Sequence, residues 1–261
     1  MKISLPDSAT FFQLDLYIPL NVKNQAFNIC LTVYNTRMRK NPIIQNEYYH
    51  VFNRGNNKQQ IFFDIRDWAR FLFLVIYFQS PTIHQNISRQ VTSFVKSSVF
   101  NIKKASEIEM VKNRTVDLVN FAMMPNHFHL LLKEHKNGGI AQYMQRILCS
   151  YTKYFNTKYE KSGHLFQGPY KAVGVNDNVQ LLYLSTYIHR NPRELPKWKN
   201  KEHLYPWSSY QDYTTNNRWD ELLQQNIILS QFSNKKEYEQ FLKSSPAKEL
   251  KENLNQELFV D

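Results

Sequence analysis

The feature that most constrains the fold is a pair of apolar segments joined by a two-residue turn. Residues 116–124 (VDLVNFAMM) and 127–134 (HFHLLLKE) are rich in residues that favour β-structure. They flank Pro125-Asn126, a dipeptide typical of turns. The sequence therefore predicts a β-hairpin.

The other elements are predicted from spacing and capping. Trp68, Phe71, Leu72 and Ile76 recur at helical spacing after a possible cap at Asp64. The predicted strands and helices, including the hairpin, follow one another along the chain at 47–57 (strand), 65–79 (helix), 116–124 and 127–134 (strands), 140–158 (helix), 163–175 (strand, interrupted at Gly168-Pro169) and 177–191 (helix). This order of elements predicts an α+β fold in which helices pack on a mainly antiparallel sheet, with a ferredoxin-like or RNA-recognition-like arrangement.

The chain divides into a predicted core and several additions. We place the core domain at residues 46–210, after an N-terminal extension, 1–45, without clear periodicity. Residues 80–115 are polar and are interpreted as an insertion with a short helix near 86–98 and charged loops elsewhere. Residues 211–261 are predicted to add helices as a C-terminal extension.

The positive net charge favours a nucleic-acid partner. The chain carries 33 Lys and Arg against 22 Asp and Glu, a net charge of +11. A soluble basic protein without a nucleic-acid partner could have the same net charge. Cys30 and Cys149 are too few and too far apart for a disulfide framework or a cysteine-based zinc site, which fits the cytoplasm. No run of apolar residues reaches the length of a membrane span, and no membrane role is expected.

Two histidines on the second strand of the hairpin are candidate metal ligands. His127 and His129 are two residues apart, so both imidazoles project from the same face of a strand. Two ligands leave open positions that substrate phosphate oxygens can fill. The spacing alone is a weak motif, and two hydrogen-bonded surface histidines would show it too.

A third protein ligand is expected beside the pair. An oxygen donor would favour Mg²⁺ or Mn²⁺ over Zn²⁺. By residue type the candidates are His50, His164, Gln167 and Asn191.

The last predicted helix of the core carries a candidate nucleophile. Tyr187 and Asn191 are four residues apart, so the phenol and the amide lie on one helical face. A phenolate can attack phosphorus and form a phosphotyrosine bond that a 3′-hydroxyl later reverses. The chain has 16 tyrosines, most of them structural, and Tyr183 one turn earlier fits the spacing equally well.

Taken together, four motifs resemble a known family. They are YYHVFNRGNN, MMPNHFHLLLKE, YTKYFNTKYEKSGHLFQGPYKAV and LLYLSTYIHRNP, spread over roughly 46–210. This set resembles the HUH-superfamily single-tyrosine transposases of the insertion-sequence-200-like group, and looks closest to the branch associated with repetitive extragenic palindromes. The segment 80–115 and both terminal extensions exceed the compact core of that family.

The resemblance implies a role for each matching residue. His127 and His129 match the paired metal ligands, Tyr187 matches the nucleophile, and Asn191 falls where relatives carry a polar ligand. It further implies an HUH core that nicks single-stranded DNA beside a hairpin, leaving a 5′-phosphotyrosine and a free 3′-hydroxyl, with Mg²⁺ or Mn²⁺. Since one tyrosine holds one strand, a monomer with sequential turnovers or a homodimer would complete strand transfer.

Cationic and aromatic side chains are candidates for DNA contacts. The residues predicted to follow a phosphate track are Arg54, Arg146, Lys153, Lys171 and Arg190. Phe166, Tyr170 and Tyr49 could stack on bases, or could equally belong to the core.

Two other function classes are compatible with these residues. One is a catalytically inactive, domesticated nucleic-acid-binding module of the same fold, whose binding would not respond to a chelator. The other is a zinc hydrolase built on the histidine pair, which would activate water and form no protein–DNA bond.

Overall fold

The computed structural model describes residues 42–82, 86–100 and 102–245. Within them, four strands form one antiparallel sheet in the order β2-β3-β1-β4. The strands are β1 (Tyr48–Arg54), β2 (Val116–Met124), β3 (His127–Glu134) and β4 (Lys171–Gly174). With α2 (Ile65–Tyr77) between β1 and β2, and α5 (Gly139–Lys158) between β3 and β4, this is the ferredoxin-like arrangement, and the predicted α+β fold is confirmed.

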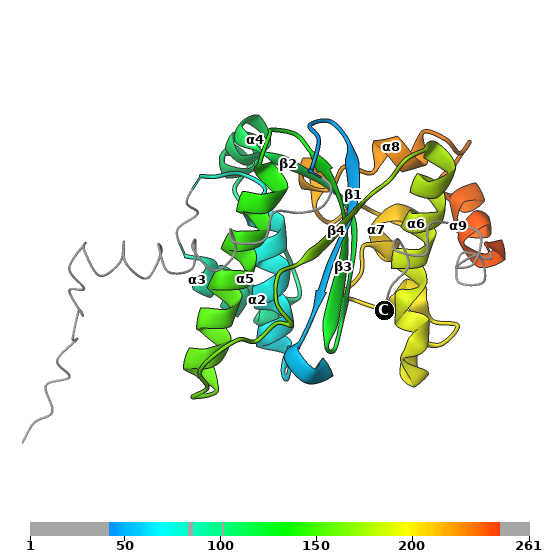
Figure 1. Cartoon of the computed structure of the whole chain (residues 1–261). Coiled ribbons are helices and arrows are strands. Elements are labelled where there is room, and N and C mark those ends of the chain that lie inside the picture. The colour runs from blue at the N-terminus through cyan, green and yellow to red at the C-terminus, as the bar shows by residue number, and fades with distance from the viewer. Residues whose placement is uncertain (1–41, 83–85, 101, 246–261) are drawn as a thin grey trace, which may run out of the picture. The chain divides into compact units, whose positions relative to one another are not determined.

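Helices cover both faces of the sheet. Figure 1 shows α2 and α5 on one face and α6 (Asn178–Arg190) on the other. The face toward α2 and α5 is apolar, since Phe128 of β3 is fully buried with its ring 5.0 Å from that of Phe71 in α2. The carboxylate of Glu134, at the end of β3, accepts hydrogen bonds from the first amides of α5 at Gly139 and Ile140. This bond pair fixes the start of α5 against the hairpin.

Most predicted elements are confirmed at their expected positions. Asp64 caps α2 through a capping box with Asp67, and the Pro125-Asn126 turn separates β2 from β3. Asp177 caps α6 by accepting a hydrogen bond from the amide of Gln180. The strand expected over 163–175 is shorter, because only Lys171–Gly174 pairs with β1.

The segment 80–115 holds two helices, α3 (Ile87–Ser97) and α4 (Lys104–Asn113). The first was predicted, but charged loops were expected where α4 lies, and that prediction was wrong. In α4 the buried Glu107 forms an ion pair with Lys104, with 2.9 Å between Oε2 and Nζ, and Met110 is fully buried. A short helix with only two buried residues has too weak a periodicity to be read from sequence.

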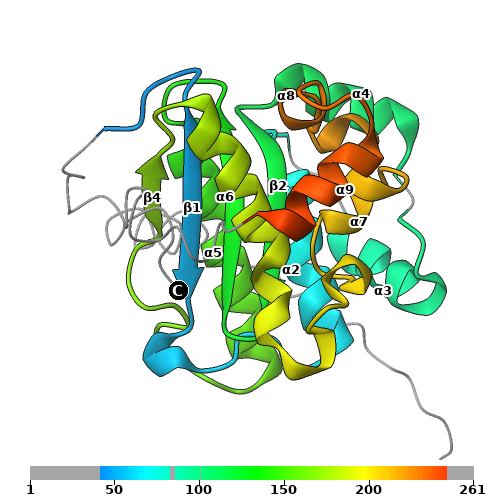
Figure 2. The same ribbon diagram turned by 90° about the vertical axis from the view of Figure 1, so that its right-hand side faces the viewer.

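Beyond α6 the chain forms short helices that pack beside it (Figure 2). These are the 3₁₀ turns η2 (Asn191–Glu194), η3 (Pro196–Trp198), η4 (Glu202–Leu204) and η5 (Asp220–Leu222), and the helices α7 (Tyr210–Thr214), α8 (Asn226–Leu229) and α9 (Lys235–Ser244); a further turn, η1 (Asn56–Lys58), follows β1. Residues 1–41 of the N-terminal extension, Cys30 among them, lie outside the described residues. Among the helices described, none is long and apolar enough to cross a membrane.

Candidate active site

The predicted histidine pair lies on the face of β3 that α6 covers. His127 and His129 alternate with Phe128, which points to the opposite face, and their rings are 5.0 Å apart and nearly perpendicular. His127 is 9% exposed and His129 is 1% exposed. The Oδ1 of Asn126, in the hairpin turn, lies 2.6 Å from the Nδ1 of His127. The pair is therefore enclosed between the sheet and α6, and His127 is held by Asn126 of the turn.

Tyr187 meets this pair from α6. Its ring lies 5.6 Å from the ring of His129, edge to face, and is fully buried. Tyr183, which the spacing could not exclude, points toward α9 instead, with its ring 5.9 Å from that of Phe241. The contact with His129 thus favours Tyr187 over Tyr183 as the residue that works with the histidines.

Asn191 ends the same helix one turn after Tyr187. Its Nδ2 donates to the backbone oxygen of Tyr187 at 3.3 Å, and the side chain is fully buried. Within the described part of the chain, its Oδ1 accepts no hydrogen bond. A buried amide oxygen left without a donor costs free energy unless a ligand satisfies it, and a hard cation is such a ligand.

The three residues expected as metal ligands carry donor atoms of types that bind divalent cations. Imidazole nitrogens suit transition metals and an amide oxygen suits Mg²⁺ or Mn²⁺, so His127, His129 and Asn191 together would be compatible with Mn²⁺. Over the described ranges, no three side chains among His, Cys, Asp and Glu gather as metal ligands. The amide of Asn191 would add a donor of a type outside that set.

His50 of β1 also belongs to this site, although the sequence suggested it only as one of four possible third ligands. It is fully buried, and its Nε2 lies 2.9 Å from the Nδ1 of His129. Its ring is 6.1 Å from that of Tyr187. The signal in the sequence was alternation, since His50 shares a face of β1 with Phe52 and Arg54.

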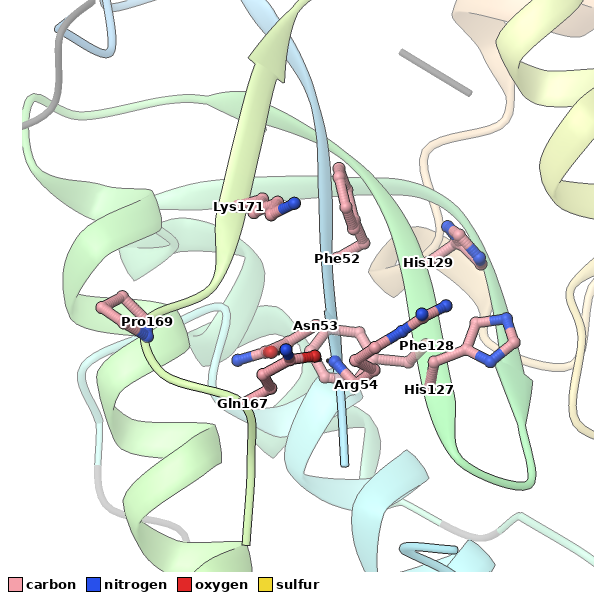
Figure 3. A pocket seen from close by; sticks show the side chains of 9 residues that line it. All are labelled: Phe52, Asn53, Arg54, His127, Phe128, His129, Gln167, Pro169 and Lys171. Atoms are coloured by element: carbon pink, nitrogen blue, oxygen red, sulfur yellow. Dashed lines mark hydrogen bonds between the residues drawn. The ribbon is translucent and has the colours of Figure 1, made fainter. Parts of the chain in front are cut away.

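A cavity of about 300 Å³ opens beside the histidines. Its walls come from β1, β3 and the segment that leads into β4 (Figure 3), and they are formed by Phe52, Asn53, Arg54, His127, Phe128, His129, Gln167, Pro169 and Lys171. Two of the predicted DNA-contact residues, Arg54 and Lys171, bring positive charge to this cavity. Arg54 is the register partner of His127, and Lys171 is that of Phe52.

The other three predicted DNA-contact residues do not line this cavity. Arg146 and Lys153 lie on α5, which packs on the opposite face of the sheet. The guanidinium of Arg146 donates to the backbone oxygen of Ser80 at 2.5 Å and lies 4.2 Å above the ring of Phe78, an arrangement that closes the end of α2. Arg190 donates to the backbone oxygen of Ser245 beyond α9. Lys153 is exposed.

The remaining candidate metal ligands and base-stacking residues differ in how far their side chains are buried. His164 is exposed and does not line the cavity, whereas Gln167 is one of its walls. Phe166 and Tyr49 are buried in the core, and Tyr170 is half-buried.

Buried polar side chains of α6 bond both to α9 and to the sheet strand β2. The hydroxyl of Tyr238 in α9 lies 2.9 Å from the Oγ of Ser185 and 2.8 Å from the Nδ1 of His189. The Nδ2 of Asn120 in β2 donates to the same Ser185 Oγ at 2.9 Å. Burial lowers the pKa of His189 to about 3, so this imidazole is neutral and bonds as a neutral group.

Comparison with known proteins finds a solved structure of similar fold and a matching family. Solved structures with a similar fold include one described as the REP-associated tyrosine transposase bound to a REP hairpin, which is 11% identical, with 67% of this chain and 83% of that chain covered and a TM-score of 0.43. No curated protein is significantly similar in sequence. Residues 86–191 match the family described as "Transposase IS200 like".

The matched stretch begins at α3, inside the segment that we expected to be an insertion. It ends at Asn191, and so contains the histidine pair and Tyr187 but leaves β1 and His50 outside. The resemblance to IS200-like transposases that the sequence motifs indicated is confirmed by this match.

Proposed function

We propose that the chain is a DNA-nicking and strand-transfer enzyme that acts on single-stranded, hairpin-flanked DNA through Tyr187. The observation that carries the proposal is the edge-to-face contact of Tyr187 with His129, 5.6 Å between ring centres, between two residues that are more than fifty positions apart in sequence. The IS200-like match supports a transposase role for this arrangement. We further propose that the chain is related to the branch of these transposases that is associated with repetitive extragenic palindromes.

The reaction exchanges one phosphoester bond for another. The Tyr187 oxygen attacks the scissile phosphorus, the bond from phosphorus to the 3′-oxygen breaks, and the proton lost by the phenol balances the one gained by the 3′-hydroxyl. Mg²⁺ or Mn²⁺, held by His127, His129 and Asn191, would supply charge stabilisation at the scissile phosphate. Arg54 and Lys171 bind neighbouring phosphates at the cavity.

Access to Tyr187 requires a local movement. Its side chain is fully buried and is not among the residues that line the cavity. Because α6 ends at Arg190 and continues into short 3₁₀ turns, a small shift of this helix end is the simplest way to expose the phenol to DNA.

The test is formation of a covalent adduct. Labelled single-stranded DNA with a hairpin is incubated with the full chain and Mn²⁺, and protein-linked DNA is sought on a denaturing gel. We expect Tyr187→Phe to bind the DNA and form no adduct, because the ring is kept and only the attacking oxygen is lost. Tyr183→Phe is the matched control and should still form it.

Adduct formation by Tyr187→Phe would assign the nucleophile to another residue. Full burial of Tyr187 favours a second candidate, the inactive nucleic-acid-binding module. That function predicts that the wild-type chain binds DNA equally well with and without EDTA and forms no adduct. A metal-dependent cleavage without adduct would instead indicate the zinc hydrolase.

A further inference from the structure

His50 has no part in the chemistry proposed above, yet it lies at the centre of the site. It is fully buried on the sheet face that carries the histidine pair, and the register pairs it with Leu131 of β3 and Val173 of β4. Its neighbour on the same face, Phe52, packs against it with ring centres 4.7 Å apart. The position of the imidazole is therefore fixed by two strands and by its neighbours.

The contact with His129 determines what His50 can do. His50 Nε2 and His129 Nδ1 are 2.9 Å apart, so one of these nitrogens carries a proton and the other accepts it. If the proton is on His129 Nδ1, then His129 Nε2 keeps its lone pair and can bind a metal. If it is on His50, the remaining proton of a neutral His129 is on Nε2, which then cannot bind a metal.

We propose that His50 is the positioning residue for His129, accepting a hydrogen bond from its Nδ1 and so holding Nε2 as the metal donor. This inference deepens the proposed function and rests on it for its catalytic meaning. Orientation of a ligating histidine through its other ring nitrogen is a general device of metal sites. The hydrogen bond occupies the Nε2 of His50, which removes this atom from the candidates for the third ligand.

The same imidazole also supports the nucleophile. Its ring meets the ring of Tyr187 edge to face, at 6.1 Å and 78°, while the ring of His129 meets Tyr187 at 5.6 Å and 84°. The two histidine rings are nearly parallel, 5.1 Å apart, so together they form one surface for the phenol. Loss of His50 would therefore loosen a metal ligand and the nucleophile together.

The first test reads the tautomer without any metal. Two-bond proton–nitrogen correlation spectra of the imidazole rings are recorded on the metal-free full chain at one neutral pH, and His129 is assigned from the spectrum of His129→Gln. We expect the Nδ1–H tautomer for His129 in the wild type. An Nε2–H tautomer there would overturn the proposal, whether or not the chain cuts DNA.

The second test compares substitutions that keep or remove the acceptor. The side-chain oxygen of His50→Gln reaches nearly the position of Nε2, whereas His50→Phe keeps a ring and loses the acceptor. We expect His50→Phe to weaken Mn²⁺ binding, measured calorimetrically, by about tenfold or more, and His50→Gln to stay close to the wild type. The exposed His164→Phe is the control and should bind normally.

The outcomes separate this inference from the proposed function. Normal Mn²⁺ binding by His50→Phe, or a loss in His50→Gln as large as in His50→Phe, contradicts the positioning role. Absence of Mn²⁺ binding and of adduct in the wild type contradicts the proposed function, while the tautomer measurement still decides whether His50 accepts the bond. Thermal unfolding of each variant checks that it is folded.

Discussion

At the scale of single residues, two amides compete as the third ligand of the proposed metal site. Residue type alone did not separate Asn191 from Gln167, and the family resemblance favoured Asn191. Asn191 is fully buried at the end of α6 with its Oδ1 lacking a hydrogen-bond donor among the described residues. Gln167 is exposed at the wall of the cavity. A buried, preformed oxygen is the better ligand, because an exposed side chain loses more conformational freedom on binding.

We therefore predict that Asn191→Ala weakens Mn²⁺ binding by about tenfold, on the order of 1.4 kcal/mol, and that Gln167→Ala leaves it unchanged. Isothermal titration of the metal-free chain with Mn²⁺ measures both. The reverse result would identify Gln167 as the ligand. Equal, normal binding by the two variants would show that neither amide is needed.

At the scale of elements, α6 is positioned by contacts on two sides. Toward the sheet, Tyr187 packs on the histidines and Ser185 accepts a hydrogen bond from Asn120 of β2, while Ser185 and His189 both bond to the hydroxyl of Tyr238 in α9. The residues after the core were predicted only to add helices. In the structure, α9 contributes to how the helix that carries the proposed nucleophile is held, through the hydroxyl of Tyr238.

Removal of this hydroxyl should loosen α6 while leaving the sheet intact. We predict that Tyr238→Phe costs about 1 kcal/mol per lost hydrogen bond and speeds hydrogen exchange of the amides of 181–190. Tyr213→Phe is the matched control, since its buried hydroxyl donates to the backbone oxygen of Val119 in β2. Hydrogen-exchange mass spectrometry checks both variants, and equal exchange of α6 in the two would refute a specific role for Tyr238.

At the scale of the whole molecule, the net charge of +11 favours binding to a polyanion but does not say where. The structure divides the predicted cations into those at the cavity, Arg54 and Lys171, and those engaged or placed elsewhere. Arg146, for instance, binds backbone oxygens at the end of α2. Contacts made within the fold therefore decide which charges face the candidate site.

This division predicts a difference in salt dependence. If Lys171 binds a phosphate, Lys171→Ala should lower the slope of log affinity against log salt for single-stranded DNA by about 0.7. Lys243→Ala is the control, because Lys243 on α9 is paired with Glu239 at 2.6 Å. Fluorescence anisotropy over a series of salt concentrations gives both slopes, and a Lys171→Ala slope equal to the wild type would exclude that contact.

Local signals in the sequence were sufficient for most of the secondary structure and for part of the site. The Pro-Asn turn between apolar runs gave the hairpin, and alternation put His127 and His129 on one face. Helical spacing put Tyr187 and Asn191 on one buried face of α6. These features follow from backbone geometry, which repeats every two or 3.6 residues and is therefore visible in a short window.

Only the tertiary structure decided how these pieces meet. The strand order places β1 next to β3, which brings His50 to His129. The packing of α6 across β2 and β3 brings the ring of Tyr187, and not that of Tyr183, to His129. Such contacts depend on strand register and helix packing between segments far apart in the chain. No local period encodes them, since they result from the burial of apolar surface by the whole fold.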